Sequence, residues 1–164
     1  MITQTEVTKD LPNKKLTVVR GFAAPIEKVW RAWTEADILD KWWAPRPYRA
    51  ETRELNFTEG GLWRYAMVGP EGVGNYCEGT FGSIKQGRSF SYSVKFTDAD
   101  WNEDTSFPVM NFLIEFESAE GGTNVTTTLT FDEEADLQRI LELGFAEGFT
   151  MAHGNLDELL AEVV

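Results

Sequence analysis

The stretch that decides the fold is residues 19–45, VRGFAAPIEKVWRAWTEADILDKWWAP, where a strand-like run is followed by two short helical segments. Pro25 predicts the start of the first helix, because the first turn needs no backbone N–H from that position and the proline ring fixes a helical φ. Thr34, followed by Asp37, predicts the cap of a second short helix that reaches about Lys41.

The first of these helices has one apolar side. Its apolar residues recur at spacings of three and four, which places them on one face: Ile26, Val29, Trp30 and Trp33. We therefore expect Trp30 to be buried between this helix and the body of the domain.

Runs of alternating apolar and polar residues predict strands in the first four fifths of the chain. The predicted strands are residues 15–23, 49–57, 62–68, 76–85, 89–96, 110–118 and 123–132. Phe90 and Tyr92 alternate with Ser91 and Ser93, for example, as in a strand with one apolar and one solvated face. Gly-containing turns between the runs favour antiparallel pairing.

After Asp132 the apolar period changes from two to 3.6, which predicts one long helix over residues 133–163. Its apolar stripe consists of Leu137, Leu141, Phe145, Phe149, Ala152, Leu156, Leu159, Leu160 and Val163. The expected fold is of the α+β class. A bent antiparallel sheet of about seven strands surrounds the long C-terminal helix, and two short helices follow the first strand.

These motifs resemble the START-like superfamily, also called SRPBCC, polyketide cyclase-like or Bet v 1-like. The resemblance rests on F-x-A-P-x-x-x-V-W-x-A-W-T (22–34), L-x-x-W-W-x-P (39–45), G-G-x-W-R-Y-x-M (60–67), G-x-F-x-x-I (79–84), F-x-x-x-x-G-G-T (116–123) and G-x-x-x-G-F (144–149). Within the superfamily the chain is most similar to the AHSA-type group, the homologues of the activator of the 90-kDa heat-shock-protein ATPase. The resemblance implies a single helix-grip domain over residues 1–164, with a structured core at 13–163 and a cavity between sheet and long helix.

The expected cavity has two candidate sets of lining residues. Gly144 and Gly148 on the long helix leave room for a ligand, or else allow a close approach of other elements. The apolar and aromatic candidates are Trp63, Tyr65, Met67, Phe81, Tyr92, Phe112, Phe145 and Phe149. They line a ligand pocket or fill an ordinary core, and both alternatives stay open at this point.

Composition restricts the partners and the compartment. The net charge of −12 argues against nucleic acid and anionic membranes, because phosphates are repelled. The chain has no apolar run long enough for a membrane span and no apolar N-terminal signal, so we expect a cytoplasmic protein. The single Cys77 cannot form an internal disulfide.

Catalytic residues are not expected. The one histidine, His153, lies at the edge of the apolar stripe and is interpreted as a helix-flank residue rather than a base. A hydrolase or cyclase mechanism would require Glu51, Arg53 or Glu78 to point into the cavity.

No metal site or cofactor is expected either. One His and one Cys cannot build a structural zinc site. Residues 98–104 begin like a calcium loop, but Glu103 replaces the required Gly and Val109 the closing Glu.

Three functions are therefore considered. The first is binding of an apolar or amphipathic small molecule in the cavity. The second is a co-chaperone role in the stress response, through contact with a 90-kDa heat-shock protein. The third is a cavity enzyme of the cyclase or hydrolase kind.

Overall fold

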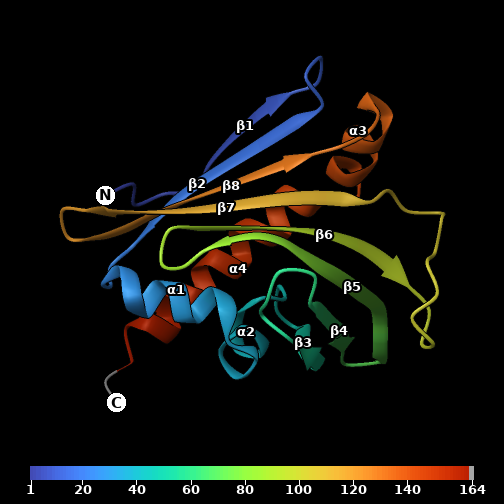
Figure 1. Ribbon diagram of the computed structural model, residues 1–164, viewed down its shortest axis with the longest axis horizontal. Coiled ribbons are helices and arrows are strands. Elements are labelled where there is room, and N and C mark those ends of the chain that lie inside the picture. The colour runs from blue at the N-terminus through green and yellow to red at the C-terminus, as the bar shows by residue number, and fades with distance from the viewer. Residues whose placement is uncertain (163–164) are drawn as a thin grey trace.

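The structure is a computed structural model that describes residues 1–162, in which one eight-stranded antiparallel sheet is combined with four helices (Figure 1). The elements in chain order are β1 (Glu6–Asp10), β2 (Lys15–Phe22), α1 (Ile26–Thr34), α2 (Ala36–Trp42), β3 (Arg49–Leu55), β4 (Leu62–Gly69), β5 (Gly72–Lys85), β6 (Ser89–Thr97), β7 (Met110–Ala119), β8 (Gly122–Thr130), α3 (Glu134–Glu142) and α4 (Phe145–Leu160). The order across the sheet is β1-β2-β8-β7-β6-β5-β4-β3. The predicted α+β helix-grip fold is confirmed.

The seven predicted strands are all present, and an eighth precedes them. This additional strand, β1, pairs antiparallel with β2 at the edge of the sheet. An edge strand is held by backbone hydrogen bonds on one side, so its sequence needs no apolar alternation, and β1 shows none. The ordered part of the chain therefore starts before the expected residue 13.

The prediction of one unbroken C-terminal helix is wrong, because Gly144 separates α3 from α4. Gly144 has a φ of +87°, in the left-handed region that glycine adopts without steric cost. Its N–H donates to the carbonyl of Leu141, which ends α3, and α4 begins at the next residue. The expected end at Val163 lies outside the described residues. No helix in residues 1–162 has the length and apolar composition of a membrane span.

The role predicted for Thr34 is also corrected. Thr34 is the last residue of α1, and its hydroxyl donates to the carbonyl of Trp30 at 2.9 Å. Glu35 takes the capping position of α2, without a side-chain capping bond. A threonine hydroxyl that is satisfied inside its own helix is not available to cap the next one.

Aromatic side chains fill the core between the sheet and the helices. Trp30 is only 5% exposed and meets Phe57, Phe90 and Phe116 edge-on at ring distances of 5.9, 5.7 and 5.0 Å. The predicted burial of Trp30 is thus confirmed. Trp42 is also buried, and its indole N–H donates to the carbonyl of Ala32 at 2.8 Å. This bond fixes α2 against α1.

Candidate functional site

A cavity of about 390 Å³ lies between the inner face of the sheet and the helices α3 and α4. Seven of the ten residues predicted from the sequence lie on its walls: Tyr65, Met67, Phe112, Gly144, Phe145, Gly148 and Phe149. The other lining residues come from the segment after α2, the strands β5, β6 and β7, the β6–β7 loop and the end of α3 with the residue that follows it.

Strand alternation explains the wall formed by the sheet. Tyr65 and Met67 are two residues apart on β4 and therefore share a face, and Cys77 on β5 is the direct cross-strand partner of Tyr65. Phe112 on β7 contributes to the same wall.

The wall formed by α4 depends on its phenylalanines and on one glycine. Phe145 and Phe149 stack at a ring distance of 5.3 Å, and Phe149 also contacts Trp43 edge-on at 5.7 Å. A Cβ on Gly148 would lie 3.5 Å from Pro45, an ordinary van der Waals contact. Gly148 therefore borders both the cavity and the segment after α2, whereas Gly144 is explained by its backbone conformation.

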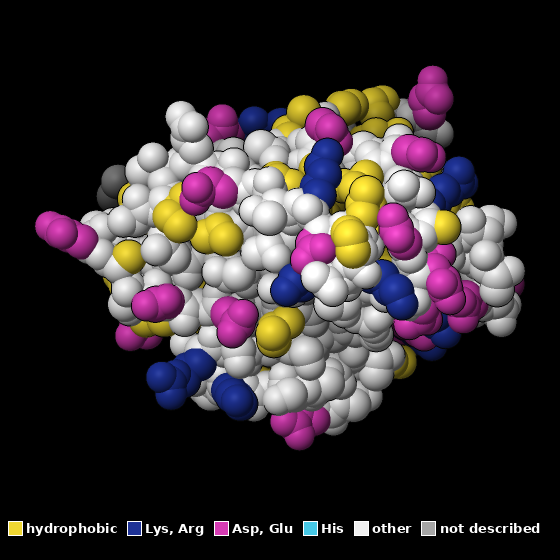
Figure 2. All heavy atoms as spheres, turned by 90° about the horizontal axis from the view of Figure 1, so that it is seen from above, with side chains coloured by type: hydrophobic (Ala, Val, Ile, Leu, Met, Phe, Trp, Pro, Cys, Tyr) yellow, Lys and Arg dark blue, Asp and Glu magenta, His cyan; other side chains and the backbone are white. Residues whose placement is uncertain are grey.

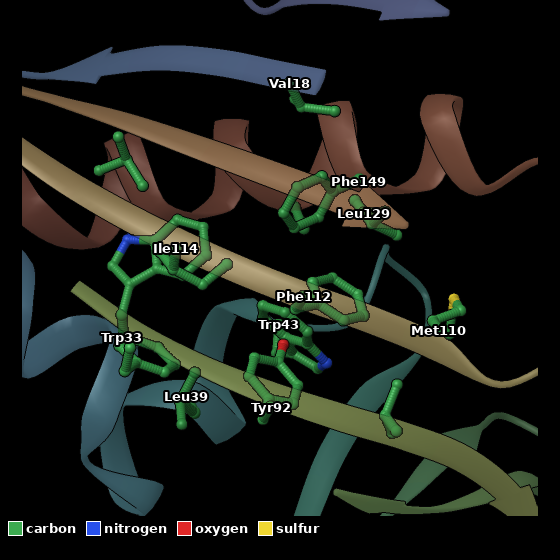
Figure 3. Close-up of a cluster of buried hydrophobic side chains, with 14 of the residues drawn as sticks. Val18, Trp33, Leu39, Trp43, Tyr92, Met110, Phe112, Ile114, Leu129 and Phe149 are labelled. Atoms are coloured by element: carbon green, nitrogen blue, oxygen red, sulfur yellow. The ribbon is translucent and has the colours of Figure 1, made fainter. Parts of the chain in front are cut away.

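Three predicted lining residues do not reach the cavity. Trp63, Phe81 and Tyr92 are buried in the core behind its wall. Trp63 stacks on Tyr65 at 4.3 Å, and Tyr92 stacks on Phe112 at 4.7 Å. Figure 3 shows Tyr92, Phe112 and Phe149, from β6, β7 and α4, in this cluster.

Sequence reasoning missed several lining residues. Apolar periodicity did not mark these residues for the cavity: Trp43, Pro45, Cys77, Phe107, Ile140 and Leu143. Phe107 belongs to the β6–β7 loop, where it packs on Phe96 at 4.8 Å and lies beneath the Arg139 guanidinium at 5.7 Å. Periodicity gives no signal for a loop residue, so only the tertiary structure places Phe107 at the cavity.

The cavity wall is electrically neutral. Within residues 1–162, the lining contains no Asp, Glu, Lys, Arg or His. Burial raises the pKa of the Tyr65 hydroxyl well above its usual value and that of the Cys77 thiol to about 12. Both groups are therefore protonated at neutral pH.

His153 is buried in the core, which corrects its interpretation as a helix-flank residue. It is 1% exposed, contacts Phe22 and Phe149 at ring distances of 5.6 and 4.3 Å, and lies outside the cavity wall. Its Nδ1 is 3.2 Å from the hydroxyl of Thr5. Burial, and secondarily the charge of Arg20, lowers the pKa of His153 to about 3.

Glu78 faces away from the cavity. Because Cys77 lines the cavity, its neighbour on the same strand points to the outer face of the sheet. Glu78 is 8% exposed there, and its carboxylate accepts from Arg64 at 2.7 Å and pairs with Lys95 at 3.4 Å. Its burial thus reflects ion pairing on the outer face.

Two other sequence candidates also have partners away from the cavity. Glu51 forms ion pairs with Arg49 and Arg53 on β3. The Asp98 carboxylate accepts backbone N–H groups of Asp100 and Asn102, which closes a turn. Residues 1–162 contain no cluster of three or more side chains able to hold a metal ion.

Comparison with known proteins identifies the relatives of the chain. The family described as Activator of Hsp90 ATPase homolog 1-like protein matches residues 23–161. A crystal structure from Mycobacterium smegmatis is 30% identical over 99% of both chains, with a TM-score of 0.90. A solution structure from Arthrobacter aurescens is 28% identical over 99% of this chain and 94% of the other, with a TM-score of 0.92. No curated protein matches the chain.

Proposed function

Since the chain belongs to the family of Activator of Hsp90 ATPase homolog 1-like proteins, a group of the START-like superfamily, we propose that it binds a small apolar or amphipathic molecule. The site is the cavity between the sheet and the helices α3 and α4. The observation that carries the proposal is the cavity itself, whose volume of about 390 Å³ falls within the range typical of ligand pockets.

The chemistry of the wall supports an apolar ligand. Met67, Phe112 and Phe149 present hydrocarbon surface from three different elements. A ligand that loses about 200 Å² of apolar surface to such a wall gains roughly 5 kcal/mol. A gain of this size corresponds to a dissociation constant of about 0.2 mM, and the cost of association weakens binding further, so affinities in the millimolar range are expected for simple hydrocarbons.

Binding is favoured over turnover because the titratable groups of the wall stay protonated. A thiol or hydroxyl nucleophile needs a neighbouring base. Cys77 has the neutral Tyr65 as its cross-strand neighbour, and Glu78 is held on the opposite face of the sheet by Arg64 and Lys95. The proposal therefore assigns no chemical step to the cavity.

A co-chaperone role is the second candidate, and the description of the family supports it. The face seen in Figure 2 has acidic and basic side chains interspersed, rather than one large patch of a single sign. If this role is correct, the protein raises the ATPase rate of a 90-kDa heat-shock protein. An unchanged rate at saturating protein would exclude it.

The cavity is tested by filling it from α4. The neutral dye N-phenyl-1-naphthylamine is titrated into the wild type, Gly148→Leu and Gly154→Leu. Gly148 borders the cavity, whereas a Cβ at Gly154 on the same helix would lie in open space, with no atom of another segment within 4 Å. We expect Gly148→Leu to weaken dye binding at least tenfold and Gly154→Leu to leave it unchanged.

Both substitutions replace a helical glycine with leucine, so their effects on helix propensity are matched. Equal dye affinity in the two folded variants would contradict the site. Mass spectrometry of the gently purified protein supplies the second test, because a co-purifying apolar molecule would identify the natural ligand class.

A further inference from the structure

The polar part of the cavity wall is small and consists mainly of two neighbouring groups. Tyr65 and Cys77 face one another across β4 and β5, and both side chains are buried. Asn75 is the other polar side chain of the wall, and it is exposed. A ligand held deep in the cavity therefore meets the Tyr65 hydroxyl and the Cys77 thiol.

The hydroxyl of Tyr65 has a proton to donate. The indole N–H of Trp43 donates to its oxygen at 3.2 Å, and an indole nitrogen can only be a donor. Trp43 is fixed in this position by edge-on contacts with Trp63 at 5.3 Å and with Phe149 at 5.7 Å. Tyr65 thus accepts from Trp43 and keeps its own O–H.

The protein offers this O–H only a poor partner. Within residues 1–162, the bond from Trp43 is the one hydrogen bond of the Tyr65 hydroxyl to a nitrogen or oxygen atom, and its other side-chain partner is the sulfur of Cys77. The adjacent polar group is the thiol of Cys77, and sulfur is a weak acceptor. An oxygen acceptor on a ligand would satisfy the hydroxyl better.

We propose that the cavity selects uncharged ligands that carry a hydrogen-bond acceptor, such as a carbonyl or ether oxygen, and that the O–H of Tyr65 donates to this acceptor. The inference rests on the proposed function and adds the ligand class and the residue that recognises it.

The surroundings explain why the ligand is uncharged. A carboxylate that enters the cavity loses its hydration, and the lining within residues 1–162 has no Lys or Arg to compensate. The cation nearest to the wall is Arg139, which lies over the ring of Phe107 at 5.7 Å but does not line the cavity. Arg64 and Lys95 are on the outer face and are paired with Glu78. Burial raises the pKa of both Tyr65 and Cys77, as expected where a negative charge is disfavoured.

Three naphthalenes of similar size provide the test. 2-Acetylnaphthalene has a carbonyl oxygen, 2-ethylnaphthalene has a methylene group in its place, and 2-naphthoate has a negative charge. Their dissociation constants are measured by NMR titration of the wild type. We expect the ketone to bind about three- to tenfold more tightly than the hydrocarbon, the usual range for one net hydrogen bond. The carboxylate should bind at least tenfold more weakly than the ketone.

Two variants assign the preference to its residue. Tyr65→Phe removes only the hydroxyl, so the ratio between hydrocarbon and ketone dissociation constants should fall to about one, while the hydrocarbon affinity changes less than twofold. Tyr76→Phe is the matched control, because it removes a tyrosine hydroxyl on the outer face of the sheet, beside Trp101, and should retain the preference.

A measurement on the wild type alone keeps the test valid if Tyr65→Phe does not fold. The carbonyl ¹³C resonance of labelled 2-acetylnaphthalene should move downfield on binding, as it does when a carbonyl accepts a hydrogen bond. A bound ketone whose resonance stays at the position found in hydrocarbon solvent would overturn the role of Tyr65.

The outcomes separate this inference from the function on which it rests. If neither the ketone nor the hydrocarbon binds, the proposed function is wrong. If both bind equally well to the wild type, the cavity remains and the recognition by Tyr65 is wrong. If 2-naphthoate binds as tightly as the ketone, the selection for uncharged ligands is wrong.

Discussion

Trp101 and Phe107 belong to the same loop but contact opposite faces of the sheet. Trp101 lies against the outer face, where its ring is 5.3 Å from the Arg64 guanidinium carbon and 5.6 Å from the ring of Tyr76. Phe107 lies on the inner face, where it lines the cavity and packs on Phe96. Side chains of the β6–β7 loop therefore contact both faces of the sheet.

The outer attachment predicts how substitutions of Trp101 behave. Trp101 has a φ of +66°, which is costly for any side chain but not for glycine. We expect Trp101→Gly to be more stable than Trp101→Ala by about 1 kcal/mol, because both lose the ring and only glycine is free of the backbone cost. Urea unfolding of the two variants measures the difference. Equal urea midpoints for the two variants would show that the backbone at residue 101 leaves the left-handed conformation in Trp101→Ala.

Because Phe107 of the β6–β7 loop lines the cavity, we expect this loop to influence ligand release. Trp101→Ala removes the contact with Arg64, which contributes about 0.5–1 kcal/mol at a partly exposed site. Because Phe107 on the same loop lines the cavity, we expect N-phenyl-1-naphthylamine to dissociate several times faster from Trp101→Ala than from the wild type. Stopped-flow fluorescence gives the rate. Identical release rates would mean that Phe107 is held independently of Trp101.

Trp30 should contribute a large share of the stability. Trp30→Ala leaves a cavity beside Phe57, Phe90 and Phe116, and such truncations cost about 3–5 kcal/mol. Leu113→Ala is the control, since Leu113 is 39% exposed on β7 and should lose less than about 1 kcal/mol. Urea midpoints compare the two, and similar shifts would contradict the placement of Trp30.

His153 should make stability depend on pH in mildly acidic solution. Its pKa is about 3 in the folded protein, below its ordinary value of 6.5, so the folded state keeps it neutral while the unfolded chain takes up a proton. The contribution of His153 is therefore complete above about pH 6.5 and declines as pH falls toward 3. The slope approaches about 1.4 kcal/mol per pH unit between pH 6 and 4.

A variant assigns this slope to the histidine. His153→Phe keeps an aromatic ring and removes the titration, so its stability should be nearly independent of pH between 6.5 and 5. The neighbouring Arg20 is paired with Asp157 and remains in both proteins. Urea unfolding across this pH range makes the comparison, and parallel curves for the two proteins would assign the slope to other groups.

Glu78 should matter for stability and not for binding. Glu78→Gln weakens the pairing with Arg64 and Lys95 and should cost about 1 kcal/mol, while dye affinity stays within twofold of the wild type. Phe149→Ala should weaken dye binding, because Phe149 lines the cavity, and should also cost stability, because Phe149 is only 5% exposed. An esterase and hydrolase screen completes the test. Turnover that disappears in Glu78→Gln would overturn the assignment of a binding protein.

The sequence predicted the features that depend on local chemistry. Pro25 marked the start of α1, and alternation placed Tyr65 and Phe112 on the inner face. The sequence pattern did not predict β1, because the pairing of β1 with β2 uses backbone groups that any sequence provides. The break at Gly144 was missed because glycine is compatible with a helix interior as well as with a helix end.

The depth of each side chain was beyond sequence reasoning. Trp63 and Tyr65 share one face of β4, so alternation treats them alike, yet only Tyr65 lines the cavity. Trp63 is covered because Trp43, from the segment after α2, packs on it at 5.3 Å. Whether a residue of β4 lines the cavity or is covered is therefore decided by contacts between segments distant in the sequence.

The break at Gly144 means that the helical wall of the cavity has two separately anchored halves. Helix α4 is tied to the rest of the protein by the bond from Asn155 to the carbonyl of Ala44 and by the ion pair of Asp157 with Arg20. Helix α3 has neither bond, and the two residues Leu143 and Gly144 join it to α4. A ligand too large for the cavity would therefore meet the least resistance at α3. The range of ligand sizes that the protein accepts is then set by how far α3 yields, while the core around α4 keeps its packing.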